Sequence, residues 1–209
     1  SNIEVRLNTD ATVDTVNSLE PDAIIIATGA RRDQIDIVGS NRKNVFTGED
    51  LRCLIMGENL DQFKDKVGLS TKLAARAGAL IGASRKPNII REVTRKWLPL
   101  GHQIVIIGGE LVGVELAEFL AERGRKVTVI DELDKFGAGL PSVRAELVLN
   151  QLHKLHATLL PGARAIEIEA NGVSYTNFRG QRRKVGADHV IIAQGAAEDL
   201  RVARQFEQA

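Results

Sequence analysis

The stretch Gln103-Ile-Val-Ile-Ile-Gly108-Gly-Glu-Leu-Val-Gly113-Val-Glu-Leu-Ala117, followed by Lys126-Val-Thr-Val-Ile-Asp131, decides the fold of this chain. An apolar run that ends in glycines is typical of a buried strand that turns directly into a helix. The second run is a further strand. It ends on an acid at close to the ~20-residue spacing used to grip the adenosine half of a dinucleotide. The stretch therefore predicts a nicotinamide-dinucleotide-binding domain.

Each position of the motif has its own physical task. Gly108 allows the tight turn, Gly109 presents backbone to phosphate, and Gly113 lets the helix pack closely on the sheet. The pyrophosphate is expected over the helix start, where free N–H groups and the positive end of the dipole attract anions. Asp131 is placed to accept hydrogen bonds from the adenosine ribose and to repel the extra phosphate of NADP(H). We therefore expect NAD(H) rather than NADP(H). The nearby charged residues Glu132 and Lys135 make this preference moderate.

Glu110 departs from the pattern, because it stands where a glycine normally lets the backbone approach the pyrophosphate. If its side chain points to solvent, the cost is a modest loss of affinity. If it turns inward, the carboxylate caps the helix and occupies the phosphate site. The alternative to a working dinucleotide site is therefore a scaffold, or a module that binds only ADP.

Two further apolar segments end in turns of small residues, as fully buried parallel strands do. The first is Pro21-Asp-Ala-Ile-Ile-Ile-Ala27-Thr28-Gly29-Ala, and the second is Asp188-His-Val-Ile-Ile-Ala193-Gln-Gly195-Ala. Together with three further segments, these two runs resemble the sequences of one protein family. The further segments are Asn44-Val-Phe-Thr-Gly-Glu-Asp-Leu, Trp97-Leu-Pro-Leu-Gly101 and the helix sequence Val112 to Gly124. That family is the two-dinucleotide-binding flavoproteins, specifically NADH:flavin oxidoreductases of the 2,4-dienoyl-CoA reductase and trimethylamine dehydrogenase type. The ferredoxin-reductase-like NADH oxidases fit the Trp97–Gly101 segment less well.

The resemblance implies roles for particular residues. Ala27, Thr28 and Gly29 would close the FAD-type domain, and Glu115 and Gly195 would border the nicotinamide. For Glu115, an exposed first-turn acid favoured by the helix dipole is an equal alternative. Complete relatives hold nicotinamide against FAD for hydride transfer. They carry FMN and an iron–sulfur cluster in an amino-terminal barrel, which would be the partner of this region.

The order of the segments predicts the fold class. We expect an α/β protein whose Rossmann-like parallel sheet is joined by an antiparallel three-stranded meander, plus part of a second, FAD-type α/β domain. The expected division is 1–57 for the partial FAD-type domain, 58–100 for a basic helical linker, 101–195 for the nicotinamide-dinucleotide domain and 196–209 for a return segment. We also expect the 209 residues to be a piece of a longer enzyme, inactive when isolated.

The linker carries nine Lys or Arg between Lys64 and Lys96 against Asp65 and Glu92. Such a run is either a contact surface for the barrel or a solvated helical segment.

Composition excludes several classes of function. The net charge of +1, from 28 basic and 27 acidic residues, gives no overall positive potential that would attract nucleic acid. No apolar run approaches the length of a membrane-spanning helix. Cys53 is the single cysteine, so these residues cannot ligate a four-iron cluster or run a dithiol cycle. The histidines show no metal-ligand spacing, and we predict no metal site. A reducing cytoplasm is the expected location.

Overall fold

The computed structural model describes residues 3–28, 30–32, 37–48, 50–51, 98, 100–194, 196–198 and 200–207. The chain divides into two compact units. One contains Ser1–Gln34 and Gly195–Ala209, and the other contains Ile35–Gln194. Our expectations for Cys53, for the basic linker except Leu98 and Leu100, and for Trp97 and Pro99 lie outside the described residues.

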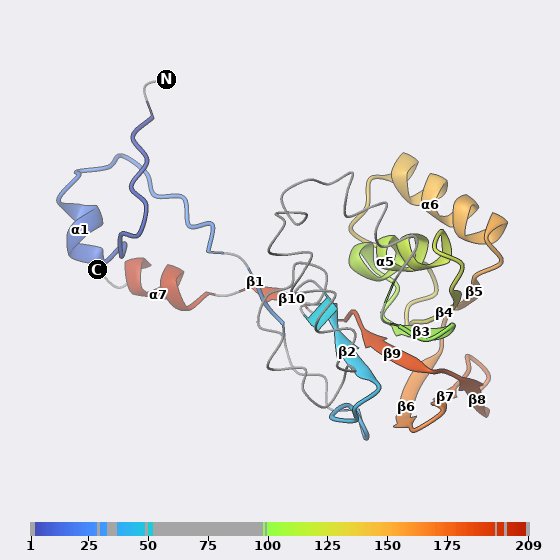
Figure 1. Ribbon diagram of the computed structural model, residues 1–209. Coiled ribbons are helices and arrows are strands. Elements are labelled where there is room, and N and C mark those ends of the chain that lie inside the picture. The colour runs from blue at the N-terminus through green and yellow to red at the C-terminus, as the bar shows by residue number, and fades with distance from the viewer. Residues whose placement is uncertain are drawn as a thin grey trace. The chain divides into compact units, whose positions relative to one another are not determined.

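A five-stranded parallel sheet forms the centre of the larger unit (Figure 1). Its strands lie in the order β2 (Val45–Thr47), β9 (His189–Ile192), β3 (Gln103–Ile107), β4 (Lys126–Ile130) and β5 (Thr158–Leu160). β3 and β4 are buried on both faces along four of their five residues, as continuous apolar runs in a parallel sheet require. The parallel sheet predicted from the sequence is confirmed.

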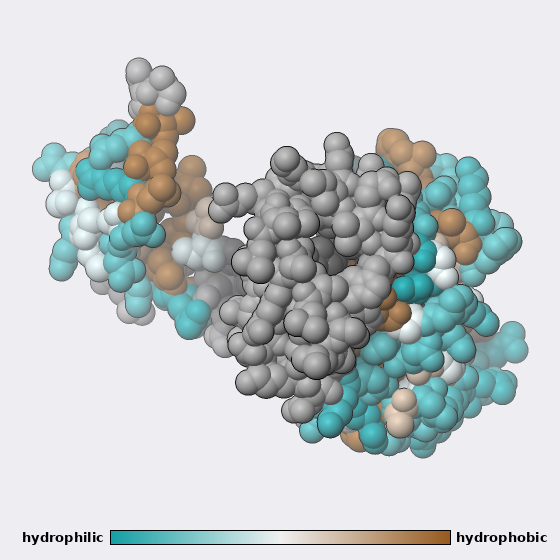
Figure 2. All heavy atoms as spheres, in the orientation of Figure 1, coloured by the Kyte–Doolittle hydropathy of each residue, from teal (hydrophilic) through white to brown (hydrophobic). Residues whose placement is uncertain are grey.

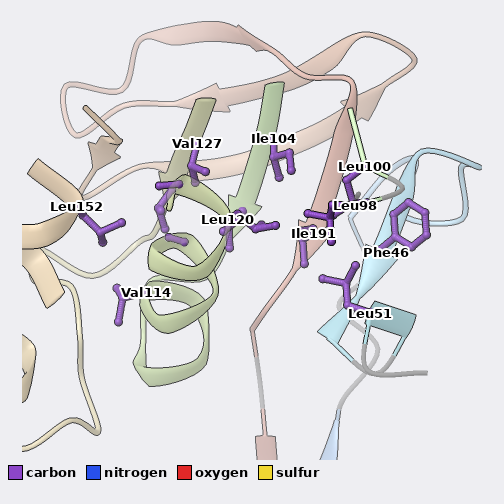
Figure 3. Packing of buried hydrophobic residues seen from close by; sticks show 14 of the residues in the cluster. Phe46, Leu51, Leu98, Leu100, Ile104, Val114, Leu120, Val127, Leu152 and Ile191 are labelled. Atoms are coloured by element: carbon purple, nitrogen blue, oxygen red, sulfur yellow. The ribbon is translucent and has the colours of Figure 1, made fainter. Parts of the chain in front are cut away.

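Two helices, α5 (Leu111–Ala121) and α6 (Ser142–Lys154), pack on one face of this sheet. Alternation along β3 sends Ile104 and Ile106 to the helix side, because successive side chains of a strand point to opposite faces. Figure 3 shows this core, where residues from α5, α6 and the strands β2, β9, β3 and β4 of the parallel sheet meet. All of the residues labelled there are buried: Phe46, Leu51, Leu98, Leu100, Ile104, Val114, Leu120, Val127, Leu152 and Ile191.

An antiparallel meander covers the opposite face of the sheet. Its strands are β6 (Arg164–Glu169), β7 (Gly172–Thr176) and β8 (Arg182–Gly186). Ile168 and Val173 from the meander join Val105 and other residues of the sheet in a second buried cluster. The predicted meander is confirmed, and with it the Rossmann-like α/β class.

The segment before β2 lies along the edge of β6. Val38 makes an isolated bridge with Glu167, and the Arg42 side chain donates to the Ile168 carbonyl at 2.9 Å. Asn44 donates to the Glu169 carbonyl at 3.2 Å. β2 then pairs in parallel with β9. The change of unit therefore lies near residue 35, within the range 1–57 that we expected to be FAD-type.

The smaller unit holds α1 (Val13–Asn17), β1 (Ala30–Arg32), β10 (Ala196–Glu198) and α7 (Arg201–Glu207). β1 and β10 pair antiparallel, so the return segment groups with the first residues of the chain. Thr12 begins α1, and its side chain accepts the Thr15 N–H at 3.2 Å. The smaller unit thus contains one short capped helix near its amino end.

The strand predicted within Pro21–Gly29 is absent from the described residues, and a second strand-like segment is irregular too. Residues 3–8 and 23–28 are irregular, although their sequences alternate or run apolar. Ile3, Val5 and Ile25 are 77%, 72% and 92% exposed, and Figure 2 shows hydrophobic (brown) atoms along this amino-terminal stretch. A strand needs a neighbour that pairs its backbone groups and covers one face. The sequence pattern reports the propensity but not the neighbour.

Candidate functional site

The predicted glycine turn follows β3 and is as tightly constrained as expected. Gly108 has a φ of +110°, a conformation that other residues rarely adopt. A Cβ added to Gly113 would lie 1.9 Å from the Gly108 carbonyl oxygen, so only glycine allows this close packing of α5 on the turn. A Cβ on Gly109 would lie 2.1 Å from the Phe136 ring. The three glycines therefore lie close together at the carboxyl edge of the sheet.

The amino end of α5 offers backbone donors beside this turn. Val112 and Gly113 have no hydrogen-bond acceptor for their N–H groups within the described part of the chain. The Leu111 N–H is already used, because it donates to the Ala138 carbonyl at 2.8 Å. The unpaired N–H groups and the positive end of the helix dipole make this a position for an anion.

Glu110 is the N-cap residue of α5, and its side chain makes no capping hydrogen bond. The residue is exposed. Of the two arrangements left open by the sequence, the structure has the outward one. The negative charge of Glu110 still lies at the mouth of the helix end, where it opposes the approach of another anion.

Asp131 is buried, with 5% of its surface exposed, and it lies against the glycine turn. One carboxylate oxygen accepts the Gly109 N–H, and the other accepts the Leu133 N–H at 2.7 Å. The end of β4 and the turn after β3 are therefore in direct contact, as the dinucleotide prediction requires. Since a carboxylate can accept about four hydrogen bonds, half of its acceptor capacity is used internally.

The loop after Asp131 folds back over the turn. The Gly137 N–H donates to the Gly109 carbonyl at 2.7 Å, and the Ala138 carbonyl accepts from Leu111. Gly137 and Gly139 have φ values of +82° and +86°, which suit the sharp path of the loop. Gly137-Ala-Gly139 is thus a packed wall of the site and not a free loop.

Glu115 lies one turn into α5 and faces α6. Its side chain is 44% exposed and lies 3.7 Å from the Arg144 guanidinium, which also pairs with Glu118 at 2.8 Å. Both interpretations of Glu115 are compatible with this geometry. Arg144 is a partner that sequence patterns did not suggest.

A cavity of about 410 Å³ lies between the carboxyl edge of the sheet and the meander. Glu132 and Arg164 belong to its lining and form an ion pair at 3.6 Å. Gln194 connects the cavity with the turn, since its side chain lies 2.7 Å from where a Gly108 Cβ would be. The cavity therefore adjoins the glycine turn through Gln194.

The remaining predicted residues belong to the smaller unit or lie outside the described residues. Ala27 and Thr28 are exposed in the smaller unit. Gly29 and Gly195 lie outside the described residues. The part of the chain that the structure describes contains no cluster of three possible metal ligands and no helix long and apolar enough to cross a membrane.

Similar proteins support this fold and carry the same region within longer chains. A NADH oxidase of Thermoanaerobacter brockii is 26% identical over 193 residues, which is 92% of this chain and 24% of that protein. A bilirubin reductase of Mediterraneibacter gnavus is 26% identical over 198 residues, which is 95% of this chain and 24% of that protein. This chain therefore spans about a quarter of the length of these relatives.

A solved structure of a 2-naphthoyl-CoA reductase in complex with 2-naphthoyl-CoA shares the fold, with a TM-score of 0.62 at 24% identity. The match covers 98% of this chain and 24% of that one. A family model described as pyridine nucleotide-disulphide oxidoreductase matches residues 3–209, and the chain belongs to that family.

Proposed function

We propose that this chain is the nicotinamide-dinucleotide-binding region of a larger flavin-dependent oxidoreductase and that it binds NAD(H). Members of its family bind FAD and a pyridine nucleotide. The observation that carries the proposal is the hydrogen bond from the Gly109 N–H to Asp131, beside the N–H groups of Val112 and Gly113, which have no acceptor among the described residues. An acid and phosphate-binding backbone then lie at one edge of the sheet, as a dinucleotide requires.

The residues of the turn fit a pyrophosphate. Gly108 and Gly109 have no Cβ to keep an anion at a distance, and Val112 and Gly113 supply two N–H donors. The remaining acceptor sites of the Asp131 carboxylate would accept hydrogen bonds from a ribose. Its charge disfavours a ribose that carries a 2′-phosphate, so NAD(H) is the proposed coenzyme.

A nicotinamide coenzyme, when bound, would supply a hydride for FAD in the complete enzyme. The residues of this chain contribute position and electrostatics. Glu115, oriented by Arg144 at 3.7 Å, would border the nicotinamide from α5, together with Gly195. Ala27, Thr28 and Gly29 would belong to the FAD site of the neighbouring domain.

For the complete enzyme, we propose the 2,4-dienoyl-CoA reductase and trimethylamine dehydrogenase type. The named relatives support an oxidoreductase, and this region covers 24% of each. The rest of such an enzyme would include an amino-terminal barrel with FMN and an iron–sulfur cluster. We propose the cytoplasm as its location. The substrate would be chosen in the barrel.

A second candidate is a module that binds ADP or serves only as a scaffold. Two observations favour it: the exposed Glu110 carboxylate stands at the helix end, and the Leu111 N–H is already taken by Ala138. Both weaken the attraction of the site for a pyrophosphate.

Calorimetric titration of the chain with NADH, NADPH and ADP tests both candidates. We expect micromolar binding of NADH and weaker binding of NADPH. Glu110→Gly should strengthen NADH binding several-fold, because one repulsive charge is removed from the helix end. Glu122→Gly, at the C-cap of the same helix, is the matched control and should leave the affinity unchanged.

Binding of NADH only after the Glu110→Gly substitution would favour the second candidate. Absence of binding by NADH and ADP alike, in the unmodified chain and in the variant, would overturn the dinucleotide proposal.

A further inference from the structure

The adenosine end of the candidate site contains an exchangeable pair of charges. Glu132 directly follows Asp131, and Arg164 begins β6 on the meander. Their side chains are 59% and 75% exposed, and the closest nitrogen and oxygen atoms are 3.6 Å apart. A pair this exposed and this long is weak, since exposed ion pairs contribute about 0–1 kcal/mol. Either side chain can therefore turn to another partner.

Asp131 alone does not fix the choice of coenzyme. The residue is only 5% exposed, and both carboxylate oxygens already accept backbone N–H groups. The first acid at the end of β4 that is open to solvent is Glu132. It lines the cavity that adjoins the Gly108 turn through Gln194.

Arg164 faces the same cavity with a group that suits phosphate. A guanidinium presents paired N–H donors that match phosphate oxygens, and it stays charged at all working pH values. With Glu132 in place, the anionic partner of Arg164 is a carboxylate of the protein itself. That carboxylate also repels any further anion at the mouth of the cavity.

We propose that Glu132 and Arg164 form a coenzyme selector, in which Glu132 occupies Arg164 and thereby excludes a ribose 2′-phosphate. The inference rests on the proposed function and assigns the cavity between Glu132 and Arg164 to the adenosine ribose. Removing the Glu132 charge frees Arg164 for the 2′-phosphate, so one substitution shifts the preference from NAD-type to NADP-type ligands.

The test compares adenosine 5′-phosphate with adenosine 2′,5′-bisphosphate, which differ by the 2′-phosphate alone. Calorimetric titrations use the unmodified chain, Glu132→Gln, Arg164→Gln and the double variant. We expect Glu132→Gln to strengthen bisphosphate binding roughly tenfold, relative to the monophosphate, at low salt. The double variant should lose this gain, because the cation that receives the phosphate is gone.

Glu167→Gln is the matched control. Glu167 is also an acid of the larger unit, and it pairs with Arg182 at 3.4 Å on the meander. Its substitution changes the net charge equally but should leave the ratio of the two affinities unchanged. Circular dichroism checks that the variants retain the fold, which these exposed side chains should not disturb.

The selector is overturned if the unmodified chain binds the monophosphate but Glu132→Gln changes the affinity ratio no more than Glu167→Gln does. A gain that survives in the double variant also overturns it, since Arg164 would then play no part. If neither nucleotide binds to any variant, the proposed function itself fails, and the selector fails with it.

Discussion

The two edges of the parallel sheet differ in whether their polar groups are paired by hydrogen bonds. At the amino edge, the Gln103 N–H donates to the Asp188 carboxylate at 2.8 Å, and the Gly101 N–H donates to Nδ1 of His189 at 2.9 Å. The Asp188 N–H returns a bond to the Gln103 carbonyl at 2.8 Å. These groups pair with one another by hydrogen bonds. We call the amino edge closed for this reason.

The carboxyl edge also uses an aspartate, Asp131, to accept backbone N–H groups. Here, however, the Val112 and Gly113 N–H groups have no acceptor among the described residues, and a cavity adjoins the turn. An edge that is fully paired contributes stability alone. An edge that keeps donors free can also bind a ligand. Substitutions should therefore separate stability from binding at the amino edge and couple them at the carboxyl edge.

The largest effect is expected for Gly113→Ala at the carboxyl edge. The new Cβ would lie 1.9 Å from the Gly108 carbonyl oxygen, and both atoms belong to packed backbone. We expect a loss of at least about 3 kcal/mol in the free energy of unfolding, together with loss of dinucleotide binding. Urea denaturation followed by circular dichroism measures the first effect, and NADH titration measures the second.

Gly124→Ala is the control for this prediction. Gly124 has a φ of +73°, but an added Cβ meets no atom within 4 Å. Its cost should be about 1 kcal/mol, from the left-handed conformation alone. Equal costs at Gly124 and Gly113 would contradict the packing argument.

Asp131→Asn should have the next largest effect. The amide keeps one acceptor oxygen, but its NH₂ group then faces either the Gly109 or the Leu133 N–H, and a buried donor is left unpaired. We expect a loss of about 2–3 kcal/mol in stability and at least a tenfold loss in NADH affinity. Unchanged NADH affinity in a folded variant would show that Asp131 is structural alone.

Asp188→Asn tests the closed edge with the same change of side chain. Asp188 is exposed, and an asparagine oxygen can still accept the Gln103 N–H, which is 2.8 Å from the carboxylate. The expected loss in stability is about 1 kcal/mol or less. NADH affinity should be unchanged. A loss of affinity like that of Asp131→Asn would remove the distinction between the two edges.

Much of the larger unit could be predicted from sequence because its signals are local. Continuous apolar runs such as Ile104–Ile107 can be satisfied only inside a parallel sheet between two covering layers. The motif also brought Gly108, Gly113 and Asp131 together, since a strand, turn and helix of fixed spacing leave little freedom. The β7–β8 connection turns at Arg179–Gly180, where Gly180 has a φ of +73°.

The parts that failed depend on long-range partners. Residues 3–8 alternate like a strand, but the described structure gives them no strand to pair with. The Leu111 N–H is occupied by the backbone carbonyl of Ala138. Every residue has such a carbonyl, so a sequence motif cannot predict this hydrogen bond. Arg164 meets Glu132 only because the meander packs on the sheet in a particular register. Such contacts follow from tertiary packing, so the sequence of neither segment alone predicts them.

The smallest effect concerns pH at the closed edge. Burial lowers the pKa of His189 below its ordinary value, although the nearby Asp188 charge raises it in part. Phe46 packs beside the ring, with centroids 5.4 Å apart. The Gly101 N–H requires Nδ1 to be unprotonated, so the folded edge holds the neutral ring.

Because the folded pKa of His189 is depressed, the unfolded chain binds the proton first as pH falls. The contribution of His189 to stability is therefore fully present above about pH 6.5, the unperturbed value, and is lost as pH falls towards the folded pKa. Urea denaturation at pH 7.5 and 5.5 should show that the stability difference between the unmodified chain and His189→Gln shrinks at the lower pH. The slope should stay well below the ~1.4 kcal/mol per pH unit of one whole proton, because the ring is only half-buried. A difference that grows on acidification would mean that Asp188 outweighs burial, and the closed edge would then hold a charged pair.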